Sequence, residues 1–537
     1  MKSTSSAIHT YDTIVVGGGI AGLTSAAYLS RAGRKVLLIE KNRECGGLVN
    51  TFSHNGFRFD AGVRALEDAG IIFPMLQDLG IQLETVKSPV SIGVENEILH
   101  VRDGSSLGEY RDMLARLYPE STKEIDDVIV VIRKIMKYMD VLYGVENPVF
   151  KDMKRDREFV MKQLLPWLPK FLLTVRKINK LDTPVEEYLD TIIQNRSLRD
   201  IIAQHFFRST PTFFALSYFS LYLDYFYPKG GVGQLAQVLA DKIRKEGGEI
   251  RTETTVTEVF SDEHTIRDDH GSEYAYDNLI WAADLKTLYR LTQTEGLTRK
   301  EQETISRKKT TVLERRGSES IFSLFLEVDT PLETFREIAH GHFFYTPSKR
   351  GLNETHHADL QQLLSTWQQA DRERVFSWLD KFTAYNTYEI SIPGLKYPEM
   401  APPGKTGLVV SLLAEYDLFA RIREDGWLEE FTAELETRIV RVLSKSIFPM
   451  LRDGVIEQFS FTPLSIENRV GSSEGAIVGW SFAEPVPVLN KIQQAGRSVL
   501  TPIPDIFQAG QWAYSPGGVP MSILTGKLAA DRILRKK

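Results

Sequence analysis

The sequence has little cysteine, no excess of positive charge and no long apolar run, and each shortage excludes a class of protein. Its 537 residues include one cysteine, Cys45, so no disulfide can form within the chain. Asp and Glu outnumber Lys and Arg by 71 to 65, which leaves nucleic-acid binding without overall electrostatic support. We therefore expect no nucleic-acid partner and a cytoplasmic protein whose thiol stays reduced.

Membrane-spanning, secreted and metal-binding proteins are disfavoured too. No stretch of about 18 consecutive apolar residues occurs, and residues 1–10 lack the apolar core of a signal peptide. The ten histidines show no spacing typical of metal ligands. His356 and His357 are adjacent in a polar stretch, where we expect them to face solvent. The sequence thus predicts no transmembrane helix, no leader and no metal site.

A nucleotide-binding pattern occupies the start of the chain. An apolar run leads into Gly17-x-Gly19-x-x-Gly22, a helical pattern follows, and a second apolar run ends at Glu40. In such a βαβ unit Gly17 permits a sharp turn, Gly19 lets a pyrophosphate approach the backbone, and Gly22 lets helix and strand pack closely. The helix N-terminus attracts phosphate, and Glu40 can accept hydrogen bonds from ribose. The alternative is a nucleotide-free unit that keeps its glycines for packing.

Three further motifs are spread along the chain. Gly46-Gly47 and the segment 56–62 (GFRFDAG) follow Glu40, the segment 227–235 reads YPKGGVGQL, and the segment 506–520 runs from IFQAGQW to PGGVP. Together with the first pattern they resemble the flavin amine oxidase and phytoene desaturase superfamily. The resemblance is closest to the branch of phytoene desaturases, carotenoid isomerases and retinol saturases, and it implies FAD as the cofactor.

The resemblance also implies which residues contact FAD. In the family, the strand that contains Val256 here contacts adenine through its backbone, and the C-terminal helix points its N-terminus at the flavin. Leu48 stands where many relatives have Arg, and Gln511 where many have Asp, so the contacts at these two positions are weakened. Besides Gly17, Gly19, Gly22 and Glu40, the implied set is Ile20, Ala21, Lys41, Gly47, Leu48, Gly62, Val256, Gly510, Gln511 and Val519.

Because the cofactor motifs are scattered, the FAD-binding domain must be discontinuous. We expect an α/β fold, α+β overall, in which a Rossmann-like FAD-binding domain joins a substrate domain of helices plus a mixed or antiparallel sheet. Apolar spacing predicts helices in the first substrate segment, and apolar runs at 321–326 and 407–412 predict strands in the second. The expected boundaries are 8–100, 225–310 and 475–537 for the FAD-binding domain and 101–224 and 311–474 for the substrate domain.

Two segments bear on the substrate. Residues 206–227 contain ten aromatic side chains, which fit either the walls of a site for a long apolar ligand or an ordinary helical core. Residues 151–180 combine apolar residues with nine Lys or Arg against three Asp or Glu. This composition is typical of a helix on an anionic bilayer, with Trp167 and Phe171 as the expected contacts. The alternative is a buried amphipathic helix with a solvated basic face.

The family resemblance implies an FAD-dependent oxidoreductase acting on C–C or C=C bonds of a long apolar polyene, such as a carotenoid or retinoid. Desaturation and saturation fit it, and so does cis–trans isomerisation with reduced FAD; an amine oxidase and a non-enzymatic prenyl-lipid carrier of the same fold are the rivals. Quinone or oxygen would accept the electrons. No catalytic base is identified, and Arg64, Trp512 and Tyr514 are the candidates for the substrate face.

Overall fold

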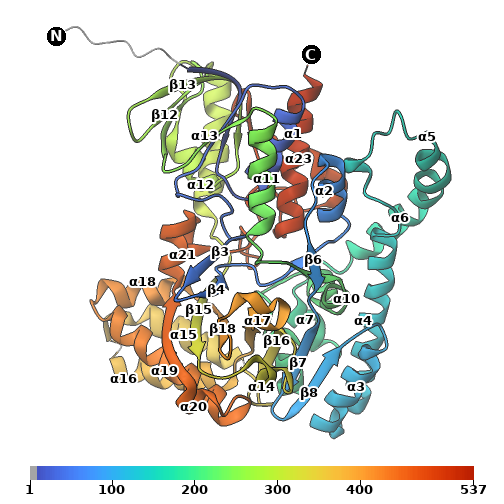
Figure 1. Cartoon of the computed structure of the whole chain (residues 1–537), viewed down its shortest axis with the longest axis vertical. Coiled ribbons are helices and arrows are strands. Elements are labelled where there is room, and N and C mark those ends of the chain that lie inside the picture. Colours follow the sequence, from blue (N-terminus) through green and yellow to red (C-terminus); the bar gives the residue numbers. More distant parts are fainter. Residues whose placement is uncertain (1–8, 353, 370, 537) are drawn as a thin grey trace.

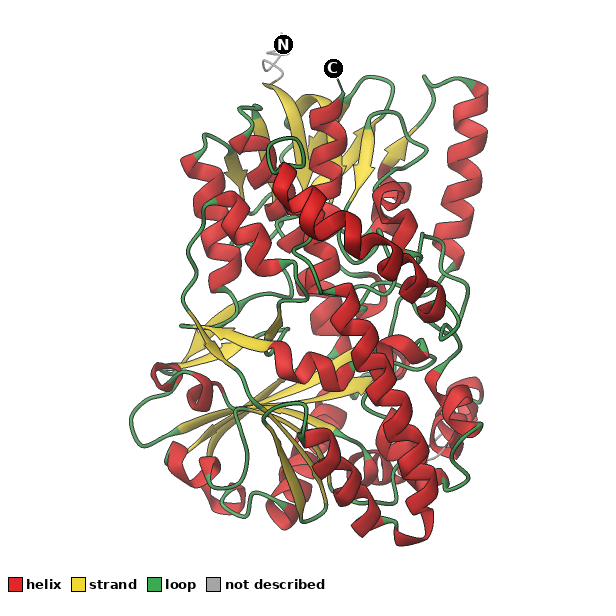
Figure 2. Ribbon diagram, turned by 90° about the vertical axis from the view of Figure 1, so that its right-hand side faces the viewer, coloured by secondary structure: helices red, strands yellow, loops and turns green. Residues whose placement is uncertain are grey.

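The computed structural model describes residues 9–352, 354–369 and 371–536, and its two large sheets lie at opposite ends of the long axis (Figure 1). Figure 2 shows them as separate yellow layers with helices around and between them. Two small sheets lie outside the large ones: a hairpin of β3 (Thr51–His54) and β4 (Phe57–Asp60), and a trio of β5 (Leu66–Glu67), β9 (Tyr225–Pro228) and β6 (Thr85–Lys87). The expected α/β class is confirmed.

The first sheet is parallel at its centre. β1 pairs in parallel with β2 and β13, and β12 and β11 add antiparallel strands. The strand order is β10 (Glu249–Arg251), β2 (Val36–Ile39), β1 (His9–Val16), β13 (Glu273–Trp281), β12 (Thr265–Asp268), β11 (Val256–Phe260) and β14 (Thr292–Gln293), with β20 (Ile506–Gln508) paired to β13.

Side chains alternate between the two faces of this sheet, as the strand period requires. Val15 and Leu38 pack with α1 (Ile20–Arg31), α11 (Gln234–Lys245) and α23 (Val519–Arg535). Val16 and Leu37 pack on the other face with α12 (Leu285–Leu291) and α13 (Arg299–Glu314). Both faces are therefore buried, and the apolar runs read from the sequence become central strands.

The second sheet is mixed. Its neighbours are antiparallel except for β16 and β7, which run parallel. A helical layer covers one face: α15 (Glu354–Ser365), α16 (Arg372–Tyr385), α18 (Tyr416–Glu424) and α19 (Leu428–Ser446). The strand order is β19 (Val455–Phe461), β15 (Ser320–Val328), β18 (Thr406–Ala414), β17 (Tyr388–Ser391), β16 (His342–Thr346), β7 (Val90–Val94) and β8 (Glu97–Val101).

Two features differ from the expectations. The boundary at residue 100 was wrong for β7 and β8, because β7 pairs with β16, about 250 residues further along the chain, and not with the first sheet. His356 does not face solvent: it is 8% exposed and stacks on Trp378 at 4.6 Å. Helical spacing puts His356 on the same side of α15 as Leu360 and Leu363, which are also buried.

The segment 101–224 is helical. Tyr218, Phe219 and Tyr222 of the aromatic run lie in the core that these helices share with β7 and β8. The helices are α3 (Ser106–Leu117), α4 (Thr122–Leu142), α5 (Arg157–Phe159), α6 (Leu165–Ile178), α7 (Val185–Asp190), α8 (Arg196–Ala203), α9 (Thr212–Leu216) and α10 (Tyr218–Asp224). α5 and α6 project from the side of the molecule (Figure 1).

Candidate functional site

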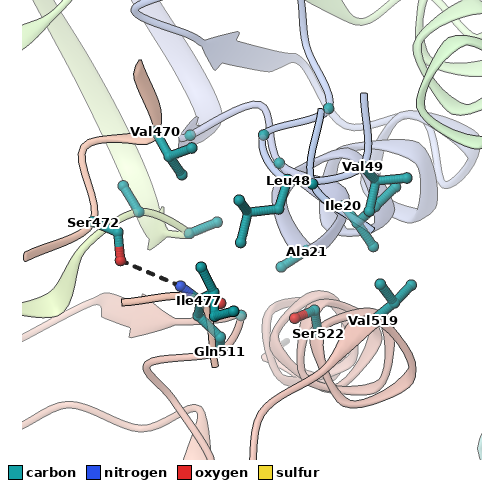
Figure 3. Close-up of a pocket in the computed structure, with 18 of the residues that line it drawn as sticks. Ile20, Ala21, Leu48, Val49, Val470, Ser472, Ile477, Gln511, Val519 and Ser522 are labelled. Carbon is teal, nitrogen blue, oxygen red and sulfur yellow. Dashed lines mark hydrogen bonds between the residues drawn. The ribbon is translucent and has the colours of Figure 1, made fainter. Parts of the chain in front are cut away.

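A pocket of about 570 Å³ opens where the first sheet meets the rest of the chain. The carboxyl ends of β1, β2 and β13 border it, as is usual for ligand sites in such sheets. Figure 3 shows Leu48, Gln511 and Val519, from distant parts of the sequence, facing one space. The pocket thus gathers the N-terminal pattern and the C-terminal motif into one site.

Two helices begin at this pocket. α1 starts after Gly19 and α23 after Gly518, and no side chain caps either N-terminus. The first turn of a helix has free N–H groups and a partial positive charge. Both helix ends therefore favour an anionic ligand such as a pyrophosphate or a negatively charged ring.

The second and third glycines of the N-terminal pattern, Gly19 and Gly22, play different parts. A Cβ added to Gly19 would meet no protein atom within 4 Å, so Gly19 leaves open space beside the pocket. A Cβ added to Gly22 would lie 1.9 Å from the carbonyl oxygen of Gly17. Gly19 therefore gives a ligand access to the backbone, and Gly22 is required where α1 packs against the turn.

Glu40 lies at the end of β2 and lines the pocket while being only 7% exposed. Its carboxylate accepts hydrogen bonds from the backbone N–H groups of Gly18, at 2.7 Å, and Asn42, at 2.9 Å. Oε1 also accepts from the side-chain amide of Asn42, at 2.8 Å, whereas Oε2 accepts only from Gly18 among the described residues and has a second lone pair. Glu40 can therefore hold the turn and still accept a hydroxyl from a ligand.

The two departures from the family pattern both lie at the pocket. Leu48 presents an apolar side chain where many relatives have a cation. The amide of Gln511 donates to the carbonyl oxygen of Ala476 at 3.3 Å and to the hydroxyl of Ser472 at 3.4 Å. Gln511 thus ties the C-terminal motif to the loop before it rather than presenting a charge.

The structure brings almost all of the residues predicted to bind FAD into this pocket. Gly22 is the exception, since it packs inside the helix–strand contact. The residues that line the pocket are Gly17, Gly19, Ile20, Ala21, Glu40, Lys41, Gly47, Leu48, Gly62, Val256, Gly510, Gln511 and Val519. Their individual contacts with FAD stay predictions.

The three candidates for the substrate face separate. Arg64 lines the pocket, but its guanidinium is buried and donates to the hydroxyls of Ser323 at 2.9 Å and Ser411 at 3.0 Å. Trp512 also lines the pocket, whereas Tyr514 lines a second cavity. Arg64 therefore joins the pocket to the second sheet, and the two aromatic rings do not share one site.

The second cavity measures about 620 Å³ and is mainly apolar. It shares Glu67 and Gly518 with the first pocket, so the two spaces adjoin at these residues. Phe213 and Phe214 of the aromatic run line it, and so do residues of α6 and α23. The aromatic run is therefore divided between a helical core and this cavity.

A group of buried charges at the pocket has no counterpart among the predicted residues. His342 and Glu389 line it, and Nε2 of His342 lies within hydrogen-bond distance of the Glu389 carboxylate, at 3.1 Å. Lys396 donates to the carbonyl oxygen of Arg64 at 2.7 Å, and burial lowers the pKa of Lys396 to about 7. Glu67 completes the group. In the sequence these residues stand out only as isolated polar residues in otherwise apolar segments.

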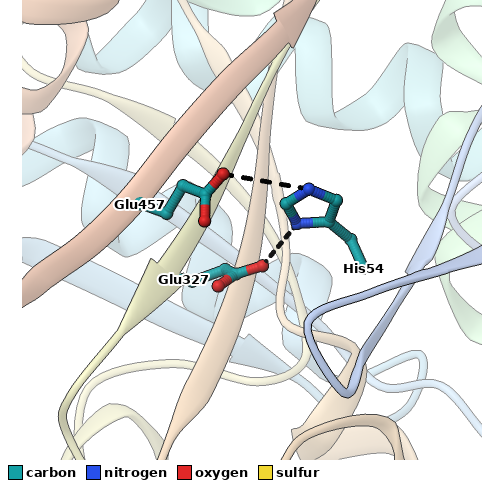
Figure 4. A group of neighbouring side chains, drawn as sticks. All are labelled: His54, Glu327 and Glu457. Carbon is teal, nitrogen blue, oxygen red and sulfur yellow. Dashed lines mark hydrogen bonds and ion pairs between the residues drawn. The ribbon is translucent and has the colours of Figure 1, made fainter.

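One group of side chains has the composition of a metal site. His54 contacts Glu327 at 2.7 Å through one ring nitrogen and Glu457 at 3.8 Å through the other (Figure 4). Asn55 donates to both carboxylates. A histidine between two carboxylates accounts for this geometry as an ion-pair cluster, and within the described ranges it is the one group of its kind.

Exposed apolar side chains gather on α6 and the turns before it. Leu165, Leu168, Leu172 and Leu173 are 38–57% exposed. The expected contacts Trp167 and Phe171 are half-buried and both line the second cavity, and their contact with a membrane stays a prediction. Over the part of the chain that the structure describes, no helix combines the length and apolarity needed to cross a bilayer.

Comparison with known proteins gives matches along nearly the whole chain. The family model described as flavin containing amine oxidoreductase matches residues 20–534. All-trans-retinol 13,14-reductase of Danio rerio is 22% identical over 562 aligned positions, which cover 97% of this chain and 86% of the relative. 4,4'-Diaponeurosporene oxygenase of Staphylococcus haemolyticus (strain JCSC1435) is 24% identical over 541 positions, which cover 97% of this chain and 96% of the relative.

A solved structure of redesigned putrescine oxidase matches with a TM-score of 0.60 at 15% identity, covering 99% of this chain and all of that chain. At this identity the likeness concerns the fold.

Proposed function

This chain belongs to the flavin-containing amine oxidoreductase family and is an FAD-dependent oxidoreductase, and from this premise we propose that its substrate is a long apolar polyene, a carotenoid or retinoid. When bound, FAD exchanges a hydride with a substrate carbon. The side chains of the chain hold the cofactor, orient the substrate and exclude water.

The pocket supplies contacts suited to each part of FAD. The N-terminus of α1 and the open space at Gly19 suit the pyrophosphate, and Glu40 suits the ribose. Val256 and its neighbours suit the adenine. The uncapped N-terminus of α23 suits negative charge on the reduced ring.

The apolar cavity carries the substrate proposal. A site that adjoins the flavin pocket and is lined by Phe213, Phe214, Trp167 and Phe171 suits a long hydrocarbon better than a small charged molecule. The names of two relatives specify retinol and diaponeurosporene, which agrees with this choice.

An amine oxidase is the rival of the same fold. The aromatic cage expected for it from the sequence pairs Trp512 with Tyr514. Trp512 instead packs edge-on against Trp480 at 4.7 Å, and Tyr514 belongs to the apolar cavity. This separation favours the polyene.

The test is anaerobic. The oxidised, FAD-loaded enzyme is mixed with carotenoids, retinoids and amines in turn while the flavin band is recorded, and quinone, oxygen or NAD(P)⁺ is then added separately. Bleaching by a polyene, with recovery by quinone or oxygen, is expected for a desaturase. Polyene product formed over many turnovers by pre-reduced enzyme without further reductant would identify an isomerase. Bleaching by amines alone would overturn the polyene proposal.

We also propose that α6 rests on an anionic membrane surface. Its leucines are exposed together with Lys162, Lys170 and Lys177, and a segment with apolar and basic side chains at one surface suits anionic lipid. The inner side of the same helix lines the apolar cavity. A polyene dissolved in the bilayer would then meet the cavity without crossing water.

A further inference from the structure

Glu67 stands where the two cavities meet. It is the last residue of β5 and lies opposite Tyr225 of β9 in the antiparallel pair. Among the described residues that line both the flavin pocket and the apolar cavity, it is the only one with a titratable side chain. A substrate that passes from the apolar cavity to the flavin must therefore pass Glu67.

The surroundings of Glu67 disfavour its charge. Asp68 on its own segment, Asp224 at the end of α10, Tyr225 and Tyr143 are the titratable groups that face it. None of these is a cation. Burial, reinforced by the charge of Asp224, raises the pKa of Glu67 to about 7. A carboxyl group with such a pKa can both give and take a proton near neutral pH.

A second acid of the pocket, Glu389, is held in the opposite state. Although burial acts to raise it, the pKa of Glu389 is lowered by the hydrogen bond from His342 and by the charges of Arg64 and Lys396. Glu389 thus favours its ionised form beside the Arg64 guanidinium. Two carboxyl groups of one pocket with pKa values pushed apart indicate distinct roles, one fixed in charge and one free to exchange a proton.

We propose that Glu67 is the acid–base residue that exchanges the substrate proton with the polyene. This inference rests on the proposed polyene function. In saturation, one carbon of a C=C bond takes a hydride from reduced flavin and its neighbour takes the proton from the Glu67 carboxyl; the π bond breaks, two C–H bonds form, the flavin is oxidised, and the carboxylate recovers its proton from water. Desaturation is the reverse: Glu67 takes the proton while oxidised flavin takes the hydride.

The first test does not depend on turnover. Infrared difference titration of the FAD-loaded protein follows the carbonyl band of the protonated carboxyl group. Burial raises the pKa of Glu319 to about 7 as well, so the wild type is expected to lose two such bands near pH 7, and Glu67→Gln is expected to lack the Glu67 transition. The control Glu84→Gln, at an exposed carboxyl paired with Lys229, is expected to keep it. The band of Glu319 is expected to remain in Glu67→Gln, and loss of as many bands in this variant as in wild type would overturn the assignment.

The second test separates the proton step from flavin chemistry. Single-turnover bleaching by the polyene is expected to slow by about 10²–10⁴-fold in Glu67→Gln, the usual contribution of a positioned acid or base. FAD content and the reaction of reduced flavin with oxygen or quinone are expected to match those of wild type and Glu84→Gln. Equal bleaching rates in wild type and Glu67→Gln would refute the role of Glu67 alone. A wild type inert to every polyene in both its oxidised and its pre-reduced form would refute the proposed function as well.

Discussion

At the scale of single residues, the proposed contact of Glu40 with the FAD ribose makes a direct prediction. Glu40→Ala removes a charged acceptor, which costs about 1.5–3 kcal/mol of binding free energy, or about ten- to 150-fold in affinity for FAD. Fluorescence titration of the apoprotein with FAD measures it. Glu44→Ala, at an exposed position on the same loop, should bind like wild type. Equal affinities of the two variants would remove Glu40 from the site.

The glycines Gly19 and Gly22 should respond in opposite ways. Gly19→Ala adds a methyl group where no protein atom lies within 4 Å, so we expect unchanged melting of the apoprotein and weaker FAD binding. Gly22→Ala forces its methyl group against the carbonyl of Gly17, so we expect a lower melting temperature. Calorimetry with and without FAD separates the effects, and similar losses of stability in both would contradict this division of roles.

The raised pKa of Glu67 also predicts how stability depends on pH. Because the folded pKa of about 7 lies above the ordinary value of 4.5, Glu67 binds its proton more tightly in the folded state. Its contribution is present below about pH 4.5 and is lost as pH rises through about 7. The free energy of unfolding of the FAD-loaded protein, measured with urea, should therefore fall less between these pH values in Glu67→Gln than in wild type. The same pH dependence in both proteins would show that Glu67 titrates as a solvent-exposed carboxyl group.

Residues of the site differ in how far the sequence reveals them. Gly17, Gly19 and Glu40 lie within one βαβ unit, so their spacing carries their meaning. Glu67, His342 and Glu389 come from β5, β16 and β17 and meet only through tertiary structure. No local spacing relates them, and an acid in an apolar strand looks the same whether it lines a cavity or faces solvent.

At the scale of elements, α6 makes a prediction about lipid binding. Changing Leu168, Leu172 and Leu173 together to Ser should lower the affinity for anionic vesicles, measured by flotation, by roughly tenfold or more. Each substitution removes part of the 1.5–3 kcal/mol, roughly, that full burial of a leucine side chain contributes. Lys170→Glu with Lys177→Glu should weaken this affinity further at low salt. Ile456→Ser with Leu500→Ser, at exposed positions of other elements, is the control; equal flotation of all variants would refute the surface.

The composition of 151–180 indicated the segment but not its orientation. α6 is apolar on two sides, with Trp167 and Phe171 four residues apart toward the cavity and Leu168 and Leu172 four residues apart toward solvent. The indole N–H of Trp167 donates a hydrogen bond to the carbonyl oxygen of Val141 at 2.7 Å, and this bond fixes the orientation of α6 about its own axis. Only the position of α4 decides which side is buried, and that information is not local.

At the scale of the whole molecule, the apolar cavity predicts a separation of cofactor and substrate binding. Met521→Trp fills part of the cavity from α23, so polyene turnover should fall at least tenfold while FAD content stays that of wild type. Leu500→Trp, an equal enlargement at an exposed position, should leave both unchanged. Anaerobic bleaching and the flavin spectrum measure the two quantities, and full turnover by Met521→Trp would show that the substrate lies elsewhere.

The fold class followed from the sequence because its central strands are short apolar runs bounded by glycine motifs. The domain boundary near residue 100 did not follow from the sequence. Apolar and polar residues alternate in β7 and β8, and this alternation predicts strands without indicating which sheet they join. Their membership depends on β16, which lies far along the chain. Local patterns predict elements, whereas the choice of partner depends on contacts that no local pattern encodes.

The pairing of α1 with α23 has a consequence for biosynthesis. Within the pocket lining, the segment from Ala509 to Ser522 is translated after every other contributor, yet it packs against the first helix. Until this segment is translated, the nascent chain has the strands proposed to hold the nucleotide half of the cofactor but lacks the helix end proposed to face the ring. We therefore expect flavin loading to wait until translation of the segment is complete, and a chain interrupted before Ala509 should accumulate colourless.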